Sequence, residues 1–144
     1  MDQNLRSAIF SAVEKEPFAK TMGLRLVELS EGCSTVAMPL KPESMDNLFS
    51  RAHGGAVFAL IDEAFETACQ THGTVAVALN VSTTYVKSPE PGASLTATAK
   101  ETSLTKRTAS YEIRVTEDGG GLIAICQALA FRTGKPLPFF DKVE

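Results

Sequence analysis

The sequence has no surplus of basic residues, no Cys-x-x-Cys pair and no apolar run long enough to span a membrane. Lys and Arg number 14 against 17 Asp and Glu, so the formal net charge is −3. Nucleic acid and anionic membranes are therefore disfavoured as main partners, because neither would meet a basic face. Residues 1–18 contain no stretch typical of a signal peptide, so we expect a cytoplasmic protein.

Cysteine and histidine are also scarce. The three cysteines, Cys33, Cys69 and Cys126, lie far apart within apolar runs, and only His53 and His72 could add imidazole ligands. Such an odd and scattered set argues against disulfides and zinc sites and indicates a reducing compartment.

Several familiar catalytic motifs are missing. The chain has no Gly-x-Ser-x-Gly elbow, no glycine-rich phosphate loop after a strand and no His-Glu-x-x-His. The glycines at 119–121 follow Glu117-Asp118 in a predicted hairpin turn, where a phosphate-binding role is not expected. The segment 47–55 and the helix that it opens are left as the candidate site.

Length and patterning indicate one α+β domain over residues 1–144, with 44% hydrophobic and 22% charged residues. Helices are predicted over 3–16, ended by Pro17, and over 54–71. The second is apolar around most of its circumference and belongs in a core. Its predicted polar strip consists of Glu63, Glu66, Thr67 and Gln70.

The remaining regular segments alternate as strands do and are separated by short turns, which predicts antiparallel pairing. They cover residues 24–29, 33–38, 75–87, 94–104, 107–116 and 122–132. We therefore expect one long helix wrapped by a five- to six-stranded antiparallel sheet, with its core over about 17–133. The Pro-rich tail 135–144 is expected to pack loosely.

Two glycines open the long helix, where Ser, Thr, Asp or Asn would normally cap. Gly54 and Gly55 would let a ligand approach the unpaired N–H groups of a helix N-terminus, which can polarise a carbonyl oxygen. A tight turn against the sheet explains them equally well. His53 suits a loop-fixing hydrogen bond that would also aim the N–H of Gly54, and Asn47 by itself is an ordinary turn residue.

Asp62 falls between the polar strip and the stripe of Phe58, Phe65 and Cys69. It is either a boundary carboxylate that reaches water or a carboxylate at a cleft whose raised pKa would make it a stronger base or nucleophile. Gly54 and Asp62 are eight residues apart, roughly 12 Å along a helix. One carbonyl cannot contact both on the same helix, so joint action predicts a site shared across a dimer interface.

Asn47, residues 52–55 and residues 59–65 resemble the hotdog-fold thioesterase superfamily, in particular its phenylacetate-pathway (PaaI-type) branch. The resemblance continues over residues 77–81, 85–89, Gly92, 103–109 and 130–132. It implies a hotdog fold, dimers assembled into tetramers, and hydrolysis of acyl-CoA thioesters, aryl-acetyl or medium-chain, without metal or organic cofactor.

The resemblance also implies roles. Gly54 would donate its N–H to the thioester oxygen, Asp62 of the facing subunit would act as nucleophile or general base, His53 would organise the loop, and Asn47 would hold the thioester or water. Glu66 stands where some relatives carry Ser or Thr. We expect Glu66 to raise the pKa of Asp62 by like-charge repulsion.

Substrate contacts are expected from further residues. The phosphates of coenzyme A call for basic groups, and the candidates are Lys87, Lys106 and Arg107, with Gly55 at the helix start. Phe58, Phe65 and Tyr85 would accept an aromatic acyl group, although core packing explains aromatic residues equally well.

Two alternatives remain. One is a hotdog enoyl-CoA hydratase or dehydratase, which uses a catalytic His and an acid in a different arrangement. The other is a non-catalytic acyl-CoA-binding module, in which Asp62 would be dispensable.

Overall fold

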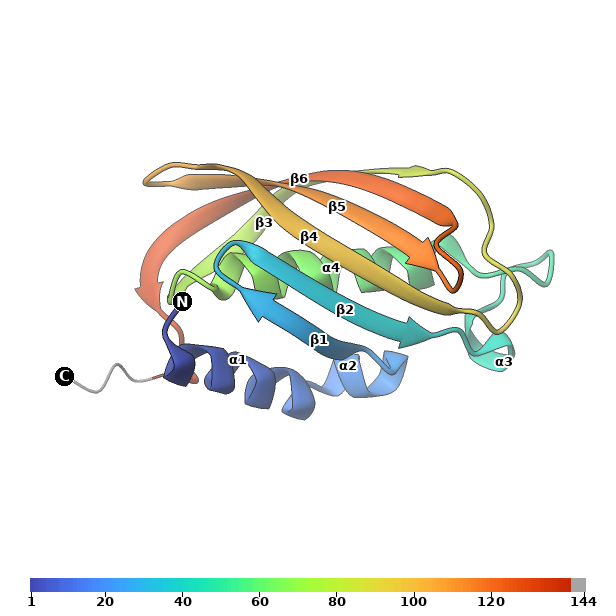
Figure 1. The fold of residues 1–144 in the computed structure, drawn as a ribbon, viewed down its shortest axis with the longest axis horizontal. Coiled ribbons are helices and arrows are strands. Elements are labelled where there is room, and N and C mark those ends of the chain that lie inside the picture. Colours follow the sequence, from blue (N-terminus) through green and yellow to red (C-terminus); the bar gives the residue numbers. More distant parts are fainter. Residues whose placement is uncertain (141–144) are drawn as a thin grey trace.

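The computed structural model describes residues 1–140, which form helices and a single sheet (Figure 1). The helices are α1 (Gln3–Lys15), α2 (Pro17–Met22), α3 (Pro42–Met45) and α4 (Gly54–Gln70). The strands are β1 (Arg25–Ser30), β2 (Cys33–Pro39), β3 (Thr74–Tyr85), β4 (Ser94–Leu104), β5 (Thr108–Glu117) and β6 (Leu122–Pro136). Residues 141–144 of the predicted tail lie outside the described residues.

The sheet is antiparallel, and its strand order is β1-β2-β4-β5-β6-β3. It curves around α4, whereas α1 and α2 lie beside β1 (Figure 1). The predicted α+β class, with a long central helix wrapped by an antiparallel sheet, is thus confirmed, and the sheet has six strands.

The strand alternation places apolar side chains against α4. Ala97 and Ala99 of β4 pair with Val115 and Ile113 of β5, and all four are fully buried. Arg114, between the last two, is exposed. Side chains alternate between the faces of a strand, so the apolar half of each pattern lines one core.

The predicted polar strip of α4 is wrong, because Glu63, Thr67 and Gln70 are buried. The Thr67 hydroxyl donates to the Glu63 carbonyl at 2.7 Å, and the Gln70 side-chain amide donates to the carbonyl of Ala76. Internal hydrogen bonds therefore let these polar side chains pack inside. The exposed stripe of α4 runs instead through Gly55, Phe58, Asp62 and Glu66.

Two short helices and the end of β6 differ from the sequence prediction. Pro17 ends α1 as expected but also begins α2, where proline suits the first helical position. β6 continues to Pro136, and the following Leu137 is only 3% exposed. The loose packing expected for the tail is therefore wrong at Leu137.

β3 is one edge of the sheet, and several of its apolar side chains are exposed. Val77, Leu79 and Tyr85 are all about half exposed, with Leu79 at 58%. An edge strand with exposed apolar side chains favours pairing with another chain. Among residues 1–140, no helix is both long and apolar enough to cross a membrane.

Candidate active site

The start of α4 presents one free backbone donor. His53 caps the helix, and its Nδ1 accepts a hydrogen bond of 2.8 Å from the N–H of Gly55. The N–H of His53 itself donates to the carbonyl of Met45 at 2.7 Å. Within residues 1–140 the N–H of Gly54 has no protein acceptor. Gly54 therefore carries the N–H that is available to a ligand.

Both glycines also lie close to neighbouring side chains. A Cβ on Gly55 would lie 3.0 Å from Nδ1 of His53, and one on Gly54 would lie 3.3 Å from the Tyr85 ring. The Tyr85 hydroxyl donates to the carbonyl of Gly54 at 3.0 Å. The predicted substrate contact of Gly55 cannot use its N–H, because His53 already accepts that hydrogen.

Asn47 shapes the loop before α4. Its Oδ1 accepts hydrogen bonds from the N–H groups of Phe49, at 2.8 Å, and Arg51, at 3.2 Å. Ser50, between them in the loop, has a φ of 54°, which is a left-handed backbone conformation. The Asn47 side chain thus stabilises the loop through hydrogen bonds to its backbone.

A pocket of about 300 Å³ brings several predicted residues together. Asn47, Gly54, Tyr85 and Lys87 line it. Arg51 also lines it, and sequence reasoning did not single this residue out. Its guanidinium donates to the Ser88 hydroxyl at 3.0 Å and to the Pro89 carbonyl at 2.9 Å. The available signal was a basic residue within the same motif, two positions before His53.

The three basic residues predicted to bind coenzyme A do not lie together in one protomer. Lys87 forms an ion pair with Glu117, and its backbone N–H donates to the carbonyl of Ile123 at the start of β6. Lys106 and Arg107 lie in the β4–β5 turn, where the Arg107 carbonyl accepts from Arg132 near the far end of β6. These two groups therefore occupy opposite ends of the sheet.

Asp62 lies in the middle of the exposed stripe of α4, and partial desolvation by the surrounding protein raises its pKa above the ordinary value. Phe58, one turn earlier, shares the stripe. Phe65 does not: it is buried, and its ring packs edge-on against Tyr111 with centroids 5.3 Å apart. Phe65 is thus a core residue rather than a candidate substrate contact.

Glu66 was expected to raise the pKa of Asp62, but the charge of Asp62 instead raises the pKa of Glu66. The raised pKa of Asp62 has desolvation as its cause. The pKa of Glu66 is raised by desolvation first and then by the charges of Glu16 and Asp62. Burial, with the charges of the same neighbours, raises the pKa of Glu63 to about 8.

Replacing Glu63 by Gln should stabilise the fold at neutral pH. The folded-state pKa of about 8 lies above the unfolded value of 4.5, so the folded state holds an extra proton between these values. Wild-type stability then falls by up to about 1.4 kcal/mol per pH unit across this window as pH rises. We expect Glu63→Gln to raise the free energy of unfolding at pH 7 by about 1–3 kcal/mol.

Urea unfolding at pH 5, 6, 7 and 8, at one protein concentration, measures this effect. Glu14→Gln is the matched control, because Glu14 is exposed on α1. An equal pH slope in wild type and Glu63→Gln would contradict the assigned pKa.

An antiparallel sheet wrapped around one long helix is the hotdog fold, which the chain shares with solved thioester hydrolases. The chain belongs to the thioesterase superfamily, whose family model matches residues 49–124, more than half of the chain.

Individual relatives agree with this family. The acyl-coenzyme A thioesterase PaaI of Escherichia coli is 30% identical over 84% of this chain and 86% of its own length. Its solved structure gives a TM-score of 0.87, covering 92% of this chain and 96% of that one at 28% identity.

Two further solved structures share the fold. The TT0310 protein of Thermus thermophilus is 36% identical, with a TM-score of 0.78 over 82% of this chain and 98% of its own. The smu.793 protein of Streptococcus mutans, solved with acetyl CoA, is 26% identical, with a TM-score of 0.74 over 79% of this chain and 91% of its own.

Proposed function

We propose that this thioesterase hydrolyses acyl-CoA thioesters, with Asp62 as the nucleophile or general base and the N–H of Gly54 as the donor to the thioester oxygen. The observation that carries the proposal is the unpaired N–H of Gly54, within the described residues, at the wall of a pocket that also contains Arg51 and Lys87. The pocket thereby offers a polarising donor and the guanidinium of Arg51 to one ligand, whereas Lys87 lies at its wall in an ion pair with Glu117.

The chemistry needs only groups of this chain and water. The carbonyl oxygen accepts from Gly54, and negative charge that develops on it is stabilised by the N-terminus of α4. Either Asp62 attacks the carbonyl carbon and water then hydrolyses the resulting anhydride, or Asp62 takes a proton from water that attacks directly. In both routes the C–S bond breaks, the thiol leaves with a proton and the acid is released.

We propose that two protomers share each site. Along α4, Gly54 and Asp62 lie roughly 12 Å apart, too far for one thioester. The exposed edge of β3, with Val77 and Leu79 facing outward, supports pairing with the β3 of a second copy. A two-fold dimer then has two equivalent sites, and two such dimers would form the tetramer.

Antiparallel pairing of two β3 strands also explains the separated basic residues. It brings the start of one β3 beside the end of the other, so Lys106 and Arg107 of one copy approach Lys87 of the second. Together with Arg51 they provide a basic rim suited to the phosphates of coenzyme A. The acetyl CoA bound to the Streptococcus mutans relative supports a coenzyme A thioester as the ligand.

Thiol release by the wild-type enzyme tests the proposal. Phenylacetyl-CoA and medium-chain acyl-CoAs should release free CoA at rates far above the background hydrolysis, whereas an enoyl-CoA should not be hydrated. Hydration of enoyl-CoA without thiol release would favour a hydratase. Saturable binding of acyl-CoA without either reaction would favour a binding module.

A further inference from the structure

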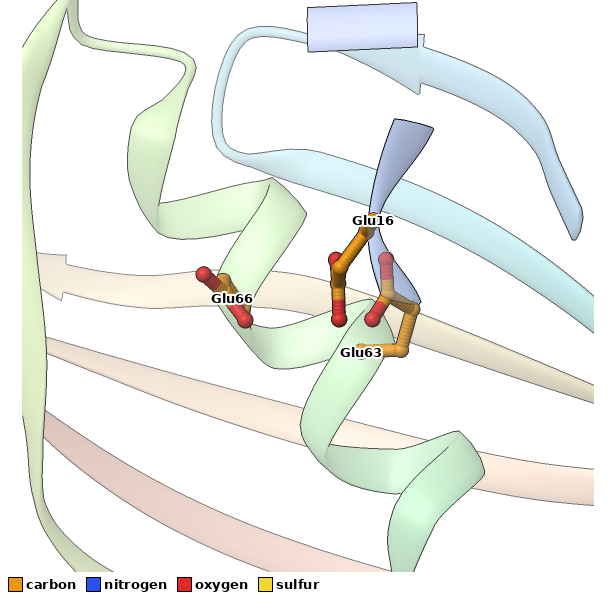
Figure 2. A group of neighbouring side chains, drawn as sticks. All are labelled: Glu16, Glu63 and Glu66. Atoms are coloured by element: carbon orange, nitrogen blue, oxygen red, sulfur yellow. The ribbon is translucent and has the colours of Figure 1, made fainter. Parts of the chain in front are cut away.

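Three carboxyl groups meet between the α1–α2 junction and the second half of α4. Glu16 lies at the junction, and Glu63 and Glu66 lie on α4 (Figure 2). One carboxylate oxygen of each lies within 4.8 Å of the other two. We refer to these three residues as the carboxyl trio. The fold thus gathers like charges from distant parts of the sequence, although they repel one another.

The trio contains a buried polar atom without a partner. Glu63 is 3% exposed, and its Oε1 has no hydrogen-bond partner within residues 1–140. The carboxyl group of Glu63 points toward that of Glu16 (Figure 2). A buried oxygen that has lost its hydration without gaining a partner destabilises the fold. The position of this atom therefore indicates a ligand between the carboxyl groups.

No basic side chain of the described chain neutralises the trio. Its ion pairs, with nitrogen and oxygen within 4.0 Å, involve none of the three carboxyl groups. Asp62, which precedes Glu63 on α4, adds a further negative charge. Lys15 lines the same pocket, but its side chain is exposed on α1. The negative charge of the trio is therefore left for a cation from solution.

Such a cation can reach the trio. All three carboxyl residues line a pocket of about 720 Å³. The pocket has room for a hydrated ion, and its water can occupy the coordination positions that the trio leaves open.

The oxygen ligands and their spacing determine which cation fits. Carboxylate oxygens are preferred by Ca²⁺ and Mg²⁺, whereas zinc prefers the nitrogen and sulfur ligands that the trio lacks. Two Ca²⁺–oxygen bonds of about 2.4 Å span 4.8 Å, the limit within which the trio oxygens lie. Mg²⁺ requires bonds of about 2.0–2.1 Å in nearly ideal octahedral geometry and should bind less tightly.

We propose that the carboxyl trio binds one hard divalent cation, Ca²⁺ in preference to Mg²⁺, and that this ion links the α1–α2 junction to α4. The ion stabilises the fold and takes no part in thioester hydrolysis. It replaces the repulsion between three carboxylates by three attractive contacts, and it supplies the buried Oε1 of Glu63 with a partner.

Calorimetry with the metal-free full chain in about 0.15 M KCl tests the proposal, because this salt screens unspecific attraction. We expect one saturable Ca²⁺ site per chain with a Kd of about 10⁻⁵–10⁻⁴ M. Glu63→Gln and Glu66→Gln should each weaken binding by about ten-fold or more. Glu66 is exposed, so its variant should fold even if the Glu63 variant does not. Glu14→Gln, exposed on α1, should keep the wild-type Kd.

Stability gives a second readout. Ca²⁺ at about a hundred-fold excess over Kd should raise the Tm of the wild type by about 5 °C or more. It should leave the Tm of Glu63→Gln nearly unchanged, so Ca²⁺ should reduce or reverse the advantage that this variant has in EDTA. Hydrogen exchange should also slow at residues 16–23 in the wild type, because the ion links this segment to α4.

Three results would overturn the inference. They are no saturable Ca²⁺ binding to the wild type, wild-type affinity in both Glu63→Gln and Glu66→Gln, and a crystal structure grown with Ca²⁺ that places the ion away from the trio. None of these measurements uses a thioester, so a failure of the proposed thioesterase function would leave them unaffected.

Discussion

Replacing Asp62 by Asn should lower kcat for thioester hydrolysis by about 10³-fold. Asparagine keeps the shape of the side chain but can neither attack the carbonyl carbon nor accept a proton from water. Binding should change little, because the proposed contacts to coenzyme A come from Arg51 and Lys87 on the loop and the end of β3. Thiol release measures turnover, and calorimetry with a non-hydrolysable thioether analogue measures affinity.

The pH profile gives a second readout of Asp62. Desolvation raises its pKa, and the group must be ionised to act. The acid limb of kcat/KM should therefore lie above the ordinary aspartate range of about 3.9, with activity lost as pH falls through the raised value. If the Asp62→Asn enzyme kept more than about a tenth of wild-type kcat, the role assigned to Asp62 would be contradicted. Glu14→Gln serves as the control for an exposed carboxyl group.

Replacing Gly54 by Pro should lower kcat/KM by about 10²–10³-fold, because it removes the N–H that donates to the thioester oxygen. Proline is compatible with this place in the helix. Gly54 is the first residue of α4, a position that accepts proline. His53 before it has φ −65° and ψ 136°, a conformation favoured by residues that precede proline.

Gly54→Ala is the matched control, because alanine keeps the N–H. Its Cβ would lie 3.3 Å from the Tyr85 ring, so the ring must shift slightly and a smaller loss is expected. Equal losses in Gly54→Ala and Gly54→Pro would show that crowding against Tyr85, rather than the missing donor, lowers the activity.

Most of the sheet could be predicted because strand patterns are local. In β5, Tyr111, Ile113 and Val115 alternate with exposed Glu112 and Arg114, and this period of two appears directly in the sequence. The glycine pair and the carboxylate on α4 were placed on one helix by the same kind of local pattern, whereas their functional roles came from the family resemblance and stay predictions. They lie within one helix, where spacing alone determines their separation.

Features that join distant segments could not be predicted. Glu63 shares a cluster of carboxyl groups with Glu16, 47 residues earlier, and its burial depends on how such distant segments pack. The helical period therefore assigned Glu63 to a polar strip, although the folded chain buries it.

The aromatic residues show the same limit. Phe58 and Phe65 are seven residues apart, two helical turns, and the sequence left open for both whether they accept an aromatic acyl group or pack in the core. Only Phe58 is exposed, whereas Phe65 packs against Tyr111 of β5. The two positions point to nearly the same side of the helix, so their different burial depends on what packs against each part of α4, which no local pattern specifies.

Co-expression of Gly54→Pro with Asp62→Asn tests the shared site most directly. Each variant alone should be nearly inactive. When equal amounts assemble at random, about a quarter of all sites combine an intact Gly54 from one copy with an intact Asp62 from another. We therefore expect the mixture to recover about 25% of wild-type turnover. Activity that stays at the level of the two parents would contradict a site built from two subunits.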